Sequence, residues 1–198
     1  WRSNHEYREC HRKRVMLIAQ RTKETNIAEH VVYMFQVEDM IRANELNLEL
    51  IIERVIRPQI QDETVVERYI DWYKGLIKQM KDERLHERGH LYEINEILTE
   101  LLLLHNTLIN ISKDKKYLQV FEEALPVLKD FQQKSQSGDL NLIEVGFNAL
   151  YGKMILKLKK QEISPASEEG FQRISKLLGT LAVFYKKMKT GDMNFMNN

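Results

Sequence analysis

Cysteine, proline and glycine are all scarce in this sequence, which contains one, three and eight of them in 198 residues. The single cysteine, Cys10, has no partner for a disulfide within the chain, a usage typical of proteins in a reducing compartment. The scarcity of proline and glycine, together with abundant Leu, Ile, Glu and Lys, favours helix. Sustained polar–apolar alternation and Asn-Gly or Asp-Gly turns are absent, so strands are not expected. We therefore predict an all-α cytoplasmic protein.

Long apolar runs and a strong charge of one sign are also lacking. The longest apolar stretch, 97–111, is interrupted by Thr, Glu, His and Asn, so it does not qualify as a membrane span. The formal net charge is +1, whereas residues 1–15 alone carry five basic and two acidic side chains. The remaining chain is therefore slightly acidic. Because nucleic-acid binding depends on a basic face that neutralises phosphates, we expect no nucleic-acid partner and no membrane partner.

The C-terminal part of the chain is the exception to this charge balance. Residues 141–198 carry nine basic and five acidic side chains, whereas 16–140 carry 16 and 22. We interpret the basic residues as the solvated face of two amphipathic helices. The alternative is that they steer self-association or the approach of an acidic partner.

Helical periodicity and capping residues divide the chain into helices. Asn26 is expected to cap the first helix, Pro58 to end the second, and Ser164 with Pro165 to begin the last, which Gly191 ends. The predicted helices are approximately 26–44, 48–57, 62–84, 90–112, 115–134, 140–162 and 164–191. The fourth is apolar nearly all round, which predicts a helix surrounded by others at the centre of the bundle.

The domain organisation expected from these patterns is simple. Residues 1–15 are polar and lack periodicity, and we expect a disordered or extraneous leader there. Residues 16–191 are predicted to form one bundle of about six to seven helices, followed by a tail over 192–198. Deleting the leader is expected to change the stability of the bundle little.

The segment His86-Glu87-Arg88-Gly89-His90 matches the H-E-x-x-H pattern of zinc metalloproteases, in which two imidazoles one helical turn apart bind Zn²⁺. Here Arg88 is charged and Gly89 breaks a helix, so the two histidines need not share a face. We interpret the match as coincidental and the segment as a surface connection, with a catalytic zinc site as the alternative. Phosphate-binding loops, dinucleotide-binding glycine motifs and nucleophile elbows are absent. No metal and no cofactor are therefore expected.

Two polar side chains interrupt the apolar stripes of predicted helices: Glu38 on the first helix and His105 on the fourth. A carboxylate on such a stripe must be paired or protonated, and Arg42, one turn beyond Glu38, is its expected partner. We predict a buried polar cluster between the two helices, formed by Gln36, Glu38, Asp39, Arg42 and His105. This cluster either fixes the helix register, or binds a ligand or transfers a proton through its carboxylate and imidazole.

The first helix also carries a resemblance. Its segments 25–29 (TNIAE) and 33–43 (YMFQVEDMIRA) are similar to the opening of a bacterial family of small helical proteins catalogued as a domain of unknown function. Other similar segments are Gly89-His90, Leu104-His105, Leu150-Tyr151-Gly152 and Ile163-Ser164-Pro165. The resemblance covers about 16–190. It implies a helical fold that begins near Met16, and it implies no activity.

These observations favour a non-enzymatic helical protein that acts through protein contacts, with a second copy of itself or with another protein as the partner. The alternative is an enzyme or small-ligand binder whose site is a buried carboxylate and histidine between the first and fourth helices. The two differ in the surface that they require: an apolar patch for protein contacts, or a pocket lined by convergent polar groups for a ligand.

Overall fold

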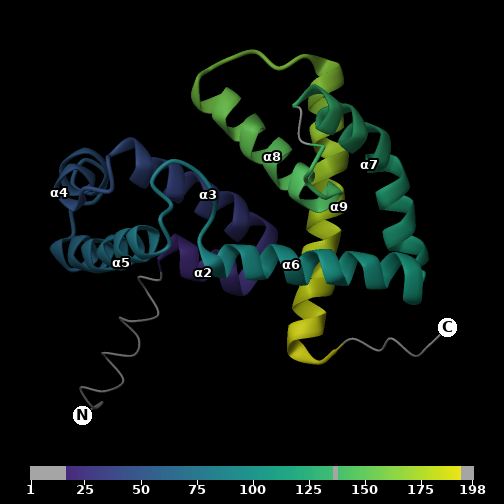
Figure 1. The fold of residues 1–198 in the computed structure, drawn as a ribbon, viewed down its shortest axis with the longest axis horizontal. Helices are drawn as coiled ribbons and strands as arrows, with labels where there is room; N and C mark the ends of the chain where they lie inside the picture. The colour runs from purple at the N-terminus through teal and green to yellow at the C-terminus, as the bar shows by residue number, and fades with distance from the viewer. Residues whose placement is uncertain (1–16, 136–137, 193–198) are drawn as a thin grey trace, which may run out of the picture. The chain divides into compact units, whose positions relative to one another are not determined.

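The computed structural model describes residues 17–135 and 138–192, and these residues form helices without any strand (Figure 1). The prediction of an all-α protein is confirmed. The expectations for the leader at 1–15 and for most of the C-terminal tail lie outside the described residues. The α-helices are α2 (Ile18–Thr25), α3 (Ile27–Ala43), α4 (Leu48–Ile51), α5 (Glu63–Asp82), α6 (Tyr92–Asn106), α7 (Lys115–Lys134), α8 (Leu142–Leu158) and α9 (Pro165–Thr190).

Two short π-helical segments continue α-helices of this fold: η1 (Ile52–Ile56) follows α4, and η2 (Thr107–Ile111) follows α6. No helix in the described part of the chain has both the length and the apolar composition that crossing a membrane requires.

Capping residues set the helix ends where the sequence predicts them. The Asn26 side chain accepts hydrogen bonds from the backbone N–H groups of Ala28 and Glu29, at 3.1 and 3.4 Å. The Ser164 hydroxyl caps α9, with Pro165 in its first turn. Gly191 ends this helix in the left-handed conformation with φ 75°, which glycine adopts without a steric penalty.

Helix α2 is one element that the sequence analysis missed. Its eight residues, IAQRTKET, are amphipathic but include only two apolar side chains, which is a weak signal in so short a segment. Ala19 and Thr22 are nevertheless buried, and the Thr22 hydroxyl donates to the backbone carbonyl of Ile18 at 2.9 Å. One side of this short amphipathic helix is therefore buried, although its sequence offers few apolar positions.

The chain divides into two compact units, which we describe separately. Among the described residues, the first unit contains 17–25 and 36–92, and within it α4, η1 and α5 pack against one another. Its largest buried side chains include Ile51, Ile56 and Met80, which are at most 1% exposed.

The second unit contains 26–35 and 93–192, and α7, α8 and α9 pack against one another within it (Figure 1). Gly146 of α8 permits the close approach of these helices. A Cβ atom added there would lie 3.4 Å from side-chain atoms of Leu128 and Leu178, which belong to α7 and α9. The carboxylate of Glu100 on α6 accepts hydrogen bonds from the Tyr185 hydroxyl, at 2.5 Å, and from the Lys189 ammonium, at 2.7 Å, both on α9.

The predicted burial of the fourth helix on all sides is wrong in part. Ile94, Leu98 and Leu101 of α6 are buried, but Leu103 is 61% exposed and Ile111, at the end of η2, is 74% exposed. The wider π-helical turn displaces the residues that follow it from the faces expected for an α-helix. Ile111 belongs to the π-helical turn itself, where α-helical periodicity no longer applies, and Leu103 lies on an exposed side of α6.

Candidate functional site

Glu38 lies in the C-terminal half of α3 and is fully buried. Its apolar stripe is buried with it, since Val31, Met34 and Ile41 are at most 4% exposed. The sequence therefore predicts the position of this carboxylate correctly. A carboxylate without solvent needs hydrogen-bond donors within the protein, because an unpaired buried charge is strongly destabilising.

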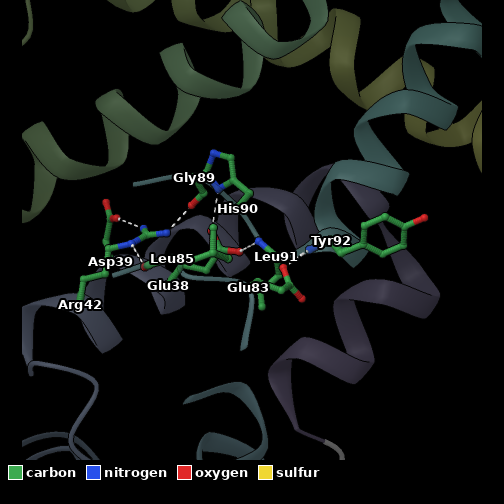
Figure 2. Close-up of polar contacts among 9 residues, drawn as sticks. All are labelled: Glu38, Asp39, Arg42, Glu83, Leu85, Gly89, His90, Leu91 and Tyr92. Atoms are coloured by element: carbon green, nitrogen blue, oxygen red, sulfur yellow. Dashed lines mark hydrogen bonds and ion pairs between the residues drawn. The ribbon is translucent and has the colours of Figure 1, made fainter. Parts of the chain in front are cut away.

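Both oxygens of Glu38 have such donors in the first unit (Figure 2). Oε2 lies 2.6 Å from Nδ1 of His90, and Oε1 accepts a hydrogen bond of 2.9 Å from the backbone N–H of Leu91. At this distance Oε2 and Nδ1 share one hydrogen bond. The side chain of His90 is 29% exposed, so this pair joins a buried carboxylate to a partly accessible imidazole.

Arg42 does not pair with Glu38, which corrects the prediction from their helical spacing. Its guanidinium instead forms an ion pair of 2.7 Å with Asp39, and it donates to the backbone carbonyl of Leu85 at 3.1 Å and to that of Gly89 (Figure 2). Glu38 already has both of its oxygens occupied. The guanidinium can satisfy several carbonyl acceptors at once because it presents five donors.

Together these contacts form a clamp on the 83–91 segment, which connects α5 to α6. We call Glu38, Arg42 and His90 the loop clamp. Glu38 bonds to His90 and Leu91 at the end of the segment, and Arg42 donates to the backbone carbonyls of Leu85 and Gly89. In addition, the carboxylate of Glu83 accepts a hydrogen bond of 2.8 Å from the backbone N–H of Tyr92 at the start of α6. The segment is thus fixed through its backbone at several points.

Glycine is required at position 89 of this segment. Its φ is +92°, a conformation that residues with a side chain rarely adopt, and an added Cβ would lie 3.0 Å from a methyl group of Leu85. The Gly89 carbonyl is also an acceptor for Arg42. A substitution there would therefore strain the backbone next to His90.

The H-E-x-x-H match lies in this clamped segment. Residues 86–90 are not helical, so His86 and His90 lack the one-turn spacing on a helix face that binds zinc in metalloproteases. His86 is exposed, while His90 is paired with Glu38. Within the described residues, no group of three or more His, Cys, Asp or Glu side chains is placed to hold a metal ion.

We expect the substitution His86→Ala to leave the metal content of the purified protein and its thermal midpoint unchanged. The exposed imidazole makes no hydrogen bond within the described part of the chain, and most exposed substitutions alter stability by less than about 0.5 kcal/mol. Inductively coupled plasma mass spectrometry of protein purified without added metal measures the first property. Stoichiometric zinc that disappears in the variant would show that the motif is functional.

His105 lies on α6 in the second unit and has a different partner. Its Nδ1 is 2.6 Å from the hydroxyl of Tyr117, and the ring of Phe121 contacts it edge-on at 4.9 Å between centroids. Burial lowers the pKa of His105 to about 4 and raises that of Tyr117. The imidazole is therefore neutral at pH 7.

The five residues of the predicted cluster are thus not joined by one hydrogen-bond network. Glu38 and His105 are both buried, as their stripes predict, but they belong to different compact units and have separate polar partners. Asp39 and Arg42 form an ion pair at the clamp, and Gln36 is half-buried on α3 outside the clamp's hydrogen bonds. The sequence analysis missed His90 and Tyr117, which are the actual partners.

The clamp contains the groups for proton transfer, since a buried carboxylate that orients an imidazole is a common general-base arrangement. The same contacts also suit a purely structural role, in which they hold the 83–91 segment against α3. Every buried side-chain nitrogen and oxygen in the described residues has a hydrogen-bond partner.

Fold and site together define an all-α protein in which a buried glutamate and an arginine of one helix clamp an interhelical segment. A family model described as "Domain of unknown function (DUF4924)" matches residues 16–192, and the chain belongs to this family. Comparisons with curated proteins and with solved structures gave no match. The matched range includes every described helix and agrees with the resemblance found in the sequence over 16–190.

Proposed function

We propose that this protein acts through protein contacts, by associating with a second copy of itself through a groove between α7 and α9. The groove has a volume of about 640 Å³ and is the observation on which the proposal depends. It lies entirely within the second unit. Its lining residues are Pro126, Val127, Asp130, Phe131, Lys134, Ser135, Ala166, Ser167, Gly170, Phe171 and Ile174.

The shape and composition of the groove suit a protein surface. Gly170 brings α9 close to α7, because a Cβ atom there would lie only 3.0 Å from a methyl group of Val127. The rings of Phe131 and Phe171 remain partly exposed in its walls. Aromatic and aliphatic side chains of this kind provide much of the binding energy at protein interfaces.

The charged rim of the groove favours a second copy as the occupant. Asp130 and Lys134 lie one turn apart on α7, and they are 58% and 75% exposed with an ion pair of 2.8 Å between them. In a twofold interface the same patch meets itself, so residue i faces residue j and residue j faces residue i. Asp130 of each copy can therefore pair with Lys134 of the other copy, so that no charge is left unpaired in the interface.

Reversal of one rim charge is expected to weaken the dimer. Lys134→Asp places an aspartate opposite Asp130 of the other copy, and we expect the dissociation constant to rise at least about tenfold from the like-charge contact. The double variant Asp130→Lys/Lys134→Asp restores opposite charges and should restore dimerisation. Sedimentation velocity over a concentration series measures both changes.

The matched control is Arg173→Glu, which reverses a charge in a comparable exposed pair on α9, with Glu169 at 2.6 Å. Arg173 does not line the groove, so the dimer should be unchanged. A monomer at all concentrations, or a double variant as weak as the single one, would contradict the proposal.

A second candidate function is a ligand or proton-transfer site at the loop clamp. The specific observation in its favour is the 2.6 Å pair of Glu38 and His90, whose imidazole is partly accessible. Glu38→Gln and His90→Gln distinguish the two roles. If both variants fold normally yet lose a small molecule that the wild-type protein carries, the clamp is a site; if they lose only stability, it is structural.

We further propose that the two compact units fold as one helical domain in the cytoplasm. Two of the three boundaries between the units fall within α3 and within α6, so a helix runs from one unit into the other at each, and the third lies between α2 and α3. The presence of one cysteine in 198 residues supports a reducing compartment. A single cooperative unfolding transition is expected for such a domain.

A further inference from the structure

We propose that the second unit contains a binding site for a phosphate-bearing small molecule with an apolar ring, such as a nucleotide. The site is a pocket of about 450 Å³ on α9 and the start of α7. This volume lies within the range of pockets that bind small ligands. Its lining residues are Asp114, Lys116, Lys176, Gly179, Thr180, Val183, Phe184 and Lys187.

The charge of the pocket favours an anion. Three lysines face one acidic residue, Asp114. Lys176 is paired with Glu123 at 2.8 Å, but Lys116 and Lys187 have no acidic partner among the described residues. A ligand with several negative charges would be attracted by these ammonium groups. A phosphate ester or a polyphosphate has that chemistry.

The apolar wall of the pocket favours a ligand that also contains a ring. Phe184 presents its face to the Lys187 ammonium, which lies 5.7 Å from the ring centroid. The edge-on contact of Phe184 with the buried Tyr117, at 6.0 Å, holds the ring in place. Val183 beside it is 56% exposed. A planar base could pack on this wall while its phosphates reach the lysines.

Gly179 leaves space in the same wall. It lies in the interior of α9, where glycine is the least favourable residue apart from proline, and a Cβ atom added there would meet no atom within 4 Å. Close packing of helices therefore does not require this glycine, in contrast to Gly170. A larger side chain at position 179 would occupy the pocket without disturbing the fold.

Isothermal titration calorimetry with ATP, tripolyphosphate and adenosine, at about 50 and 150 mM salt, tests this inference. We expect ATP to bind most tightly and adenosine most weakly, with the affinity for ATP falling as salt rises. The double variant Lys116→Ala/Lys187→Ala should weaken ATP binding at least about tenfold by removing both unpaired cations. The control Lys74→Ala/Lys78→Ala, which removes two exposed lysines of α5, should have no effect.

Two variants are expected to act in opposite directions. Asp114→Asn removes the acidic charge but retains a side chain that caps α7, so ATP should bind more tightly. Gly179→Leu should reduce binding sterically, while circular dichroism shows an unchanged or higher thermal midpoint. Absence of ATP binding at about 1 mM, or binding that neither lysine nor glycine variants alter, would overturn the proposal.

The groove of the proposed dimer and this pocket share no lining residue. Dimerisation and ATP binding can therefore be tested independently. A monomeric protein could still bind ATP in the pocket, and a dimer could form without binding ATP.

Discussion

Replacing Glu38 with alanine is expected to lower the free energy of unfolding by about 3 kcal/mol, the lower part of the range for removing one member of a buried pair. The change removes the hydrogen-bond partner of His90 Nδ1 and the acceptor of the buried N–H of Leu91. It also creates a cavity in the apolar stripe of α3. Each unsatisfied donor adds a desolvation cost of about 1–3 kcal/mol.

Chemical denaturation monitored by circular dichroism measures this loss, and Asp39→Ala provides the control. Asp39 is also paired, with Arg42, but its side chain is 53% exposed, and exposed ion pairs contribute only about 0–1 kcal/mol. The double-mutant cycle of Glu38→Ala and His90→Ala should give a coupling energy within the range of about 0.5–3 kcal/mol for contacting residues. A loss below about 1 kcal/mol for Glu38→Ala would show that the clamp does not stabilise the fold.

Acidification is expected to destabilise the protein through His105. Burial lowers the pKa of this imidazole from 6.5 to about 4, so at pH values between these two the unfolded state binds a proton that the folded state excludes. Stability is therefore highest above pH 6.5 and falls as the pH decreases toward 4. The linkage relation gives a loss of about 2 kcal/mol between pH 7 and pH 5 from this residue alone.

The variant His105→Gln isolates this contribution, because glutamine does not titrate. The variant should be less stable at pH 7, since the bond to the Tyr117 hydroxyl is lost or altered, but the difference in unfolding free energy between pH 7 and pH 5 should shrink by about 2 kcal/mol. His86→Gln, at an exposed position, is the control and should keep the wild-type pH dependence. An unchanged pH dependence in His105→Gln would show that His105 does not carry the effect.

Local chemistry explains which parts of the fold the sequence predicts. A helix N-cap bonds to backbone groups two or three residues away, so Asn26 and Ser164 identify helix starts without knowledge of the tertiary structure. Burial of Glu38 and His105 also follows from the helical period of their neighbours. By contrast, α2 is a short amphipathic helix with only two apolar side chains, so its sequence gives a weak signal even though Ala19 and Thr22 are buried.

Partners of the buried polar groups were not predictable in the same way. Arg42 has the correct spacing for Glu38, but the observed donor, His90, is 52 residues distant in the sequence. Only the folding of the 83–91 segment brings it to α3. His90 also belongs to the H-E-x-x-H match, which the sequence analysis interprets as a coincidental surface connection. Tyr117 is separated from His105 by the turn between η2 and α7, and nothing in the spacing indicates that contact.

We propose that the loop clamp is structural and that the surface of the second unit carries the function. Native mass spectrometry of protein purified from its own host tests this most directly, because mass, bound metal and bound small molecules are observed together. The account predicts a species of twice the mass of the single chain, without zinc, that keeps its dimer mass in His90→Gln. A monomer carrying a small molecule or metal that is lost in both Glu38→Gln and His90→Gln would contradict it.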